Sequence, residues 1–258
     1  MSGLPADLTS ALEQLAAAET LLVALDFDGV LAPLVEHADD ARPLPASAAA
    51  VRELAALPST FTAMISGRAL DSLRRAASPA PETLLIGSHG AEAWTGPNAQ
   101  PLELTPEQAQ LLVRARAAVQ EVVDAHPGTW METKPAGVVL HTRSASEDVA
   151  AAATDAARTR LTTIDGVQLT DGKQVLETSV VHTDKGEGVR TLRTLTGATA
   201  VLFAGDDVTD ENGFAALLPG DLGLKIGPGE TRASFRVDSP EAVTEVLETL
   251  LELRRTRR

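Results

Sequence analysis

Short runs of hydrophobic residues alternate along this chain with segments of helical periodicity. Leu21-Leu22-Val23-Ala24-Leu25 contains no polar position, which is typical of a strand buried on both faces of a parallel sheet. Similar runs lie at 61–65, 84–86, 200–204 and 222–226, with a shorter one at 235–237. Helical segments lie at 5–19, 45–57, 69–76, 185–195, 212–218 and 240–254. This alternation predicts βαβ units and a parallel sheet.

The pattern changes in the middle of the chain. Thr105-Pro106-Glu107 provides a start signal for a long helix that reaches Ala125. Two pairs of strands follow, 130–134 with 137–143 and 167–170 with 174–177, and a helix at 146–161 separates them. Asp171-Gly172 is predicted to form the second hairpin turn. The order α-β-β-α-β-β predicts an inserted α+β domain over residues 102–181, between core segments 1–101 and 182–258.

Composition and charge restrict the classes of function. The 258 residues are 44% hydrophobic, which is enough for a core, and they include no cysteine, so disulfides and thiolate metal sites are excluded. The net charge of −14 opposes binding to nucleic acid. We expect a cytoplasmic monomer without membrane contact, because Met1 to Ala18 lacks a basic leader region and no apolar run is long enough to span a bilayer. Arg254 to Arg258 is expected to be a disordered basic tail.

Acidic side chains follow two of the predicted parallel strands. Asp26 and Asp28 come after the first strand, and Gly29 permits a sharp turn there. Asp206, with Asp207 and Asp210 beside it, follows a strand much later in the chain. Open α/β sheets bind ligands at the carboxyl edge of their strands, so we expect these groups to meet on one rim. Oxygen ligands of this kind suit Mg²⁺ with a phosphate.

Four motifs resemble, in the same order, those of haloacid-dehalogenase-like phosphatases. They are Asp26-Phe27-Asp28-Gly29-Val30, Ser66-Gly67-Arg68, Lys185, and Gly205-Asp206-Asp207-Val208-Thr209-Asp210. Each motif alone is weak, whereas the ordered set is specific. The resemblance implies a doubly wound parallel-sheet core, and the inserted domain resembles the type-2 cap of that superfamily.

More narrowly, the chain resembles trehalose-6-phosphate phosphatases over almost its whole length after the first helix. The supporting segments are Gly87-Ser88-His89-Gly90-Ala91-Glu92, Glu132-Thr133-Lys134, His141-Thr142-Arg143 and Thr183-Asp184-Lys185-Gly186. This resemblance implies that the substrate is a small sugar phosphate, trehalose 6-phosphate, that the cofactor is Mg²⁺, and that the enzyme works through an aspartyl-phosphate.

The resemblance also implies a role for each matching core residue. Asp26 would be the nucleophile and a metal ligand, Asp28 the general acid and base whose main-chain carbonyl also binds Mg²⁺, and Asp206 a further ligand. Asp207 and Asp210 would hold metal-bound waters or orient Lys185. The residues expected to contact the substrate or its phosphoryl group are Ser66, Gly67, Arg68, His89 and Lys185, of which Ser66 and Lys185 are catalytic; Arg68 has a structural ion pair as its alternative role.

In the cap, Glu132, Lys134 and Glu177 match positions that hold sugar hydroxyls in this family. The chain departs from the family pattern directly afterwards, because Thr178-Ser179 stands where an Arg-Pro pair is usual. A phosphatase for another sugar phosphate, such as a glucosylglycerate or sucrose phosphate, therefore remains an alternative. A mutase and a non-catalytic protein that binds a sugar phosphate are the others.

Overall fold

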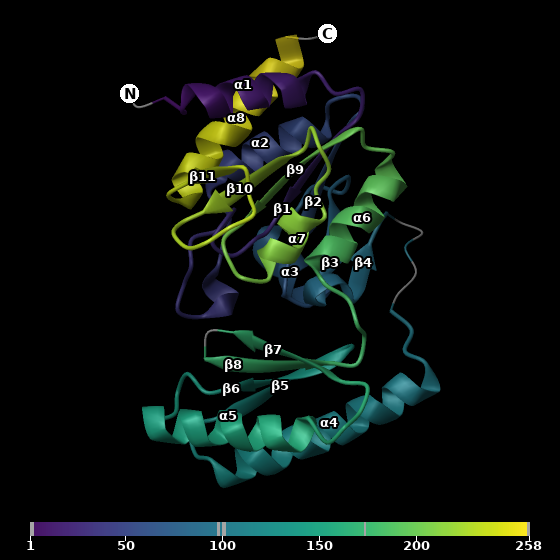
Figure 1. The fold of residues 1–258 in the computed structure, drawn as a ribbon, viewed down its shortest axis with the longest axis vertical. Coiled ribbons are helices and arrows are strands. Elements are labelled where there is room, and N and C mark those ends of the chain that lie inside the picture. The colour runs from purple at the N-terminus through teal and green to yellow at the C-terminus, as the bar shows by residue number, and fades with distance from the viewer. Residues whose placement is uncertain (1–2, 97–98, 100–101, 173, 257–258) are drawn as a thin grey trace. The chain divides into compact units, whose positions relative to one another are not determined.

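The computed structural model describes residues 3–96, 99, 102–172 and 174–256 (Figure 1). They form two compact units, the first made of Met1–Gln100 and Thr183–Arg258 and the second of Pro101–His182. The division lies within one residue of the boundaries expected from the sequence. Within the described residues, no helix has the combination of length and apolarity that crossing a membrane requires.

A seven-stranded sheet organises the first unit, with the order β11-β10-β9-β1-β2-β3-β4. All neighbours are parallel except the last pair, as the alternating pattern predicts. The antiparallel strand β4 (Glu92–Trp94) was not predicted, because three residues are too few to show a periodicity. The parallel strands are β1 (Leu21–Leu25), β2 (Thr60–Ile65), β3 (Leu84–Gly87), β9 (Ala200–Gly205), β10 (Leu222–Ile226) and β11 (Phe235–Val237).

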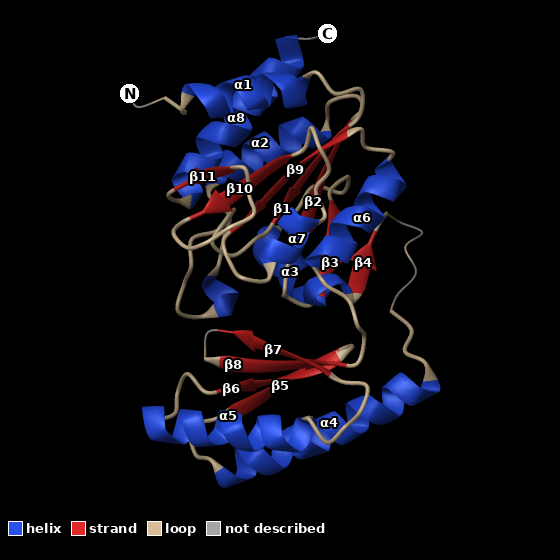
Figure 2. Ribbon diagram, viewed as in Figure 1, coloured by secondary structure: helices blue, strands red, loops and turns tan. Residues whose placement is uncertain are grey.

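Helices cover both faces of this sheet (Figure 2). The strand β1 supplies Leu21, Val23 and Leu25 to one hydrophobic cluster and its two other residues to a second cluster. Each large aliphatic side chain buried in this way contributes roughly 1.5–3 kcal/mol. The first cluster includes α1 (Ala6–Ala16), α2 (Pro45–Ala55), α3 (Leu70–Ala77) and α8 (Pro240–Thr256), and the second includes α6 (Lys185–Thr196) and α7 (Asp210–Ala215).

The C-terminal helix corrects one expectation. Arg254 to Arg258 was expected to be disordered, but Arg254, Arg255 and Thr256 complete α8. The Arg254 guanidinium donates hydrogen bonds to the main-chain oxygens of Ala16 at 2.9 Å and Ser59 at 3.0 Å. These carbonyls lie at the end of α1 and just before β2, so tertiary contacts hold a segment that composition alone suggests is free. Residues 257–258 lie outside the described residues.

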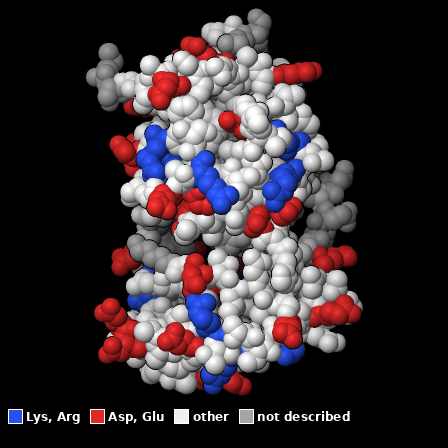
Figure 3. Space-filling view, viewed as in Figure 1, with Lys and Arg blue, Asp and Glu red and all other residues white. Residues whose placement is uncertain are grey.

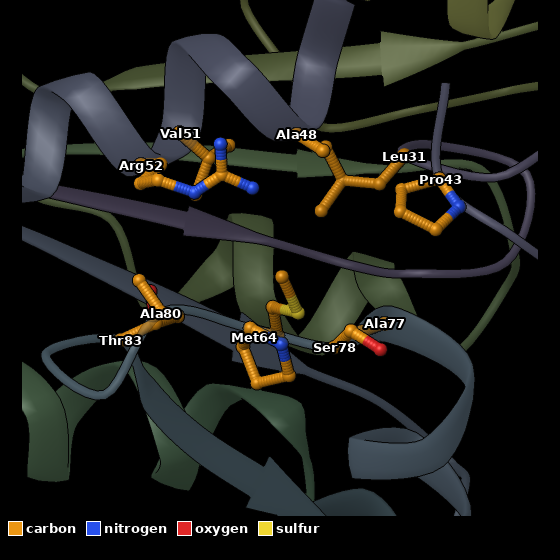
Figure 4. Close-up of a pocket in the computed structure, with 11 residues that line it drawn as sticks. Leu31, Pro43, Ala48, Val51, Arg52, Met64, Ala77, Ser78, Ala80 and Thr83 are labelled. Atoms are coloured by element: carbon orange, nitrogen blue, oxygen red, sulfur yellow. The ribbon is translucent and has the colours of Figure 1, made fainter. Parts of the chain in front are cut away.

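A small cavity lies within the first unit (Figure 4). Its volume is about 20 Å³, which is room for about one water molecule. The lining includes Leu31, Val51, Met64, Ala77 and Thr83, and none of the predicted site residues. The cavity therefore lies apart from the strand ends that carry the predicted site residues.

The second unit is a four-stranded antiparallel sheet with the order β5-β6-β8-β7. One face of this sheet packs against its two helices through a cluster that includes Val119, Leu140, Leu161 and Leu176. The elements are α4 (Pro106–Ala125), β5 (Trp130–Lys134), β6 (Gly137–His141), α5 (Glu147–Leu161), β7 (Gln168–Gly172) and β8 (Val175–Ser179). This inserted α+β unit has the predicted α-β-β-α-β-β order.

The turn of the second hairpin differs from the prediction. Asp171 and Gly172 were expected to form the turn, but both belong to β7, and Gly172 pairs with Val175. The strand β7 therefore includes Asp171 and ends at Gly172. Gln174, which has a positive φ of 62°, lies in the connection instead.

Candidate active site

The register of three neighbouring strands positions the candidate site. Leu25 at the end of β1 pairs with Met64 of β2 and with Ala204 of β9. The residues that follow these strands therefore emerge at the same edge of the sheet, because all three strands are parallel. This places the first, second and fourth motifs beside one another, as predicted from the strand ends.

A buried lysine joins two of these motifs. Lys185, the first residue of α6, has its ammonium 2.8 Å from Asp26 Oδ2 and 2.7 Å from Asp210 Oδ1. All three residues are buried, with Asp210 at 0% exposure. Asp210 also accepts hydrogen bonds from the main-chain N–H groups of Asp206 and Asp207. One ammonium thus serves two carboxylates and leaves a net negative charge in the cluster.

Two glycines allow the acidic groups to approach the backbone closely. Gly29 has a φ of +77°, and a β-carbon there would lie 2.2 Å from Asp206 Oδ2. A β-carbon at Gly205 would lie 2.2 Å from the Asp210 carboxyl carbon. Both clashes are too severe for any larger residue. The sequence therefore needs glycine at both positions to bring the first and fourth motifs together.

The electrostatics of the cluster follow from burial and from crowding of like charges. Burial raises the pKa of Asp26 well above its ordinary value, and Asp210 adds to this effect while Lys185 opposes it. Burial, followed by the charge of Asp210, raises the pKa of Asp206 to about 6. For Lys185, burial alone would lower the pKa, but the two carboxylates outweigh it and raise the value.

The donor set fits a hard divalent cation. Asp26, Asp206 and Asp210 each offer a carboxylate oxygen, and these atoms lie within 4.8 Å of one another. Oxygen-only ligands match the preference of Mg²⁺. A bound cation would also offset the burial and the charge repulsion that raise the pKa values of Asp26 and Asp206. When all three carboxylates are ionised, the Lys185 ammonium offsets only one of their three negative charges.

The Asp28 side chain points into an ion pair with Arg68. The guanidinium binds both carboxylate oxygens, with Nε at 2.6 Å from Oδ2 and an Nη at 2.7 Å from Oδ1. Arg68 also lies over the ring of Phe27, with its central carbon 5.3 Å from the ring centroid. The structure therefore contains the ion pair that was the alternative expectation for Arg68.

The second motif and the segment after β3 lie against each other. Ser66 is buried, and its Oγ accepts a hydrogen bond of 3.2 Å from the Arg68 main-chain N–H. The main-chain N–H of His89 donates to the Ser66 carbonyl at 3.1 Å. A β-carbon at Gly67 would lie 2.4 Å from His89 Nε2, so the imidazole ring covers this glycine. His89 itself has a left-handed φ of 54°, in a short 3₁₀ turn over Ser88–Gly90.

Of the three predicted cap residues, Glu132 and Lys134 lie on β5 and Glu177 lies on β8, with β6 between these two strands of the second unit. Lys134 Nζ donates to Glu177 Oε1 at 2.6 Å, and His141 Nε2 lies 2.9 Å from Glu132 Oε2. The hydrogen bond with His141 lowers the pKa of Glu132. Trp130 stacks on His141, with ring centroids 3.7 Å apart and an angle of 3° between the planes. Two pairs of polar groups thus lie on the sheet face that the helices leave uncovered.

Two residues that contact predicted site residues were not predicted to do so from the sequence. Lys225 in β10 donates a hydrogen bond to the Asp206 carbonyl oxygen. His141 was noted in a matching segment, but its contact with Glu132 depends on the pairing of Trp130 with His141. A lysine inside an otherwise apolar strand was the available signal for Lys225, because a buried charge requires a partner.

Charges of both signs are mixed over the molecular face in Figure 3, where Lys and Arg side chains lie among Asp and Glu. The sequence as a whole carries a net charge of −14. Nucleic-acid-binding domains instead gather basic residues into a patch or stripe. The face shown therefore gives no support to a nucleic-acid partner.

Comparison with known proteins identifies a family and several relatives of this chain. The family model described as trehalose-phosphatase matches residues 24–242. A trehalose-phosphate phosphatase from Mycobacterium avium is 33% identical over 250 residues, which cover 89% of this chain and 62% of the relative. A bifunctional trehalose-6-phosphate synthase/phosphatase from Thermoproteus tenax is 30% identical, over 91% of this chain and 32% of the relative. The chain thus spans less than two thirds of these relatives.

Solved structures share the fold. The C-terminal domain of the Candida albicans trehalose-6-phosphate phosphatase aligns with a TM-score of 0.82 and 20% identity, over 97% of each chain. A trehalose-6-phosphate phosphatase related protein aligns with a TM-score of 0.75 and 24% identity, over 92% of this chain and all of the other. These similarities support the haloacid-dehalogenase-like fold, in which an α/β core carries an inserted cap. From the family match over most of its length, the chain belongs to the trehalose-phosphatase family.

Proposed function

We propose that this chain is a Mg²⁺-dependent phosphatase that hydrolyses trehalose 6-phosphate to trehalose and phosphate. The observation that carries the proposal is the buried Lys185 ammonium between Asp26 and Asp210, at the edge where β1 and β9 end. This is the arrangement expected for an acid side chain that attacks phosphorus, with a cation site beside it and a lysine that binds the phosphate. Family membership supports the substrate class.

In the first half of the proposed reaction, an oxygen of Asp26 attacks phosphorus. The bond between phosphorus and the sugar oxygen breaks, and Asp28 in its acid form gives a proton to that leaving oxygen. The product is an aspartyl-phosphate on Asp26 and free trehalose. A neighbouring cation would keep the Asp26 carboxylate ionised, which is the form that attacks phosphorus.

In the second half, Asp28 takes a proton from a water molecule, which attacks the phosphorus of the aspartyl-phosphate. The acyl–phosphate bond breaks, phosphate leaves and Asp26 is regenerated. Arg68 holds both Asp28 oxygens in the structure, so Asp28 must leave this pair in order to carry a proton. A phosphate ester gives the guanidinium another anion to bind, which supports the substrate contact proposed for Arg68.

The remaining core residues hold the phosphoryl group. Lys185 would bind its oxygens through the ammonium, and Ser66 through its hydroxyl hydrogen, since the Oγ lone pair already accepts the Arg68 N–H. Gly67 and His89 lie beside Ser66 and would shape this edge. When bound by Asp26, Asp206 and the main-chain carbonyl of Asp28, Mg²⁺ would neutralise the acids and draw charge from the phosphoryl oxygens.

Two further acids would support the cation site without contacting the substrate. Asp210 would orient Lys185, to which it is hydrogen-bonded at 2.7 Å. The Asp207 side chain is exposed and accepts the N–H of Val208, and it would hold a water of the cation. In the cap, Glu132, Lys134 and Glu177 would bind sugar hydroxyls, because a disaccharide offers many donors and acceptors and little apolar surface.

A panel of sugar phosphates at one concentration, assayed for phosphate release with and without a chelator, tests the proposal. We expect strong preference for trehalose 6-phosphate and loss of activity in the chelator. Equal rates on sucrose phosphate and glucosylglycerate phosphate would favour the alternative substrate class, which Thr178-Ser179 in place of Arg-Pro keeps open. Isomerised sugar phosphate without free phosphate would indicate a mutase.

A binding protein without activity is the second candidate function. One structural neighbour is the C-terminal domain of a Candida albicans trehalose synthase regulatory protein, with a TM-score of 0.72 and 15% identity. The fold alone therefore does not decide activity. The presence of Asp26, Asp28 and Asp206 argues against this candidate, and phosphate release that Asp26→Asn abolishes would exclude it.

A further inference from the structure

Lys225 is a buried lysine that the proposed reaction does not use. It lies in β10, whose five residues are all buried, and 4% of the residue is exposed. Moving an ammonium out of water costs several kcal/mol unless its partners compensate. Its Nζ donates a hydrogen bond to the main-chain carbonyl oxygen of Asp206. The buried Lys225 ammonium thus binds the backbone turn that carries Asp206, a candidate ligand of the divalent cation.

Asp210 accepts the N–H of both peptide groups that flank Asp206, and Lys225 binds the carbonyl of the second group. Lys225 pairs with Gly205 in the sheet, which brings its ammonium to the carbonyl just beyond the end of β9. On the other side of the Asp206 α-carbon, the main-chain N–H donates to Asp210 Oδ2 at 3.1 Å. The N–H and the carbonyl belong to successive peptide planes. Fixing both planes restricts φ and ψ of Asp206 and therefore the direction of its side chain.

We infer that Lys225 is a positioning residue of the proposed cation site, which aims the Asp206 carboxylate at the cation. The contact runs to the carbonyl of Asp206, which suits a positioning role better than neutralisation of the carboxylate. The inference rests on the proposed function, because it requires that Asp206 binds a divalent cation.

Positioning and charge balance predict opposite effects. If Lys225 acted only as a nearby positive charge, it would repel a divalent cation, and its removal would tighten cation binding. If it positions Asp206, its removal leaves that peptide plane held only by the bond from the Asp207 N–H to Asp210, and weakens binding. Loss of a group that orients a metal ligand typically lowers metal affinity about 10- to 100-fold.

The test compares Lys225→Met with Lys225→Gln and with Arg193→Met. Gln keeps an N–H donor on a shorter, neutral side chain. Arg193→Met is the matched control, because it removes another partly buried cation from the same unit, the partner of Asp221, without touching the Asp206 turn. Calorimetric titration of the chelator-stripped full chain with Mg²⁺ and with Mn²⁺ gives affinity, and the melting temperature in chelator reports folding.

We expect Lys225→Met to bind both cations about 10- to 100-fold more weakly, Lys225→Gln to lose less, and Arg193→Met to keep the wild-type affinity despite a lower melting temperature. Unchanged or tighter binding by Lys225→Met would overturn the inference, and Lys225→Gln provides the same comparison if the Met variant does not fold. A wild-type chain that binds neither cation would overturn the proposed cation site and this inference together. A wild type that binds, with variants that bind equally, overturns the inference alone.

Discussion

At the scale of single residues, the core site is a cluster of acids with too little positive charge. Asp26, Asp206 and Asp210 share a small volume with one lysine, and Gly29 and Gly205 permit that crowding. The folded chain therefore carries unfavourable charge repulsion unless a cation binds. Binding of a cation to the folded state alone stabilises it by mass action, so the same repulsion couples cation binding to stability.

The pKa of Asp206 leads to a prediction about stability without a cation. Its pKa rises from the ordinary 3.8 to about 6 on folding, so the folded state holds this proton more tightly than the unfolded state. This contribution to stability is complete below about pH 4 and is lost as the pH rises through about 6. In chelator at pH 7.5, Asp206→Asn should therefore raise the free energy of unfolding by about 1–3 kcal/mol.

The measurement is thermal or urea unfolding of both proteins in chelator, across the range from pH 4 to 8. The advantage of Asp206→Asn should become small near pH 4, where the wild-type carboxyl is protonated in the folded state and about half protonated in the unfolded state. Asp207→Asn, in the same turn but exposed, is the matched control and should change little. A variant that is no more stable than wild type at pH 7.5 would contradict the electrostatic description of the cluster.

At the scale of elements, the inserted unit contains one helix that begins with a capping box, α4, and one that begins without a side-chain capping bond, α5. The Gln108 N–H donates to the Thr105 hydroxyl oxygen at 3.2 Å, and the Thr105 N–H donates to Gln108 Oε1 at 3.0 Å. Together these two bonds form a capping box. Ser146 precedes α5 without a side-chain cap bond. Thr105→Ala should therefore cost about 1 kcal/mol.

Ser146→Ala is the natural control for this experiment, because it removes a hydroxyl at the same helix position with no cap bond to lose. Chemical denaturation of the full chain, followed by a cap probe such as Trp130 fluorescence, reports the unit concerned. Equal losses in the two variants would show that the hydroxyl-to-backbone bond of α4 contributes nothing specific.

An ion pair that links β5 to β8 across β6 leads to a prediction about substrate binding. Lys134 and Glu177 form a 2.6 Å ion pair with little solvent exposure, which keeps both groups in place before a sugar arrives. Lys134→Met should raise KM for trehalose 6-phosphate about 10- to 100-fold, the loss typical of one or two hydrogen bonds to a charged group. Hydrolysis of p-nitrophenyl phosphate, which has no sugar, should change little.

Glu121→Gln serves as the control in the same unit, since it breaks an exposed pair between Glu121 and Arg160 that contributes little. Steady-state kinetics on both substrates separate the outcomes. If Lys134→Met slowed p-nitrophenyl phosphate as much as trehalose 6-phosphate, the proposed sugar contact would be wrong.

At the scale of the whole molecule, the sequence predicted what depends on the parallel direction of the strands. Asp26 and Asp206 follow parallel strands, and β1 and β9 are neighbours, so their meeting at one edge followed from the alternation of strands and helices. Residues that depend on register or on distant contacts were not predictable in this way. Lys225 reaches the Asp206 carbonyl only because β10 pairs with β9, and a single lysine in an apolar run does not reveal its acceptor.

Two segments were predicted wrongly for the same physical reason, because distant contacts outweigh the local sequence signal. Asp171-Gly172 is a good local turn signal, but the pairing of Gly172 with Val175 continues β7 to Gly172. Arg254 resembles the start of a charged tail, but carbonyls of Ala16 and Ser59 hold it. Local propensity is a weak prior where tertiary contacts compete with it.

The central claim is that Asp26 accepts the phosphoryl group, and covalent trapping tests it most directly. Wild-type protein is mixed with Mg²⁺ and trehalose 6-phosphate, quenched in acid within the first turnover, and digested for peptide mass analysis. We predict one added phosphoryl group on the peptide that contains Asp26, and none in Asp26→Asn. Steady phosphate release with no phosphorylated peptide, or with the label on a different residue, would contradict the claim.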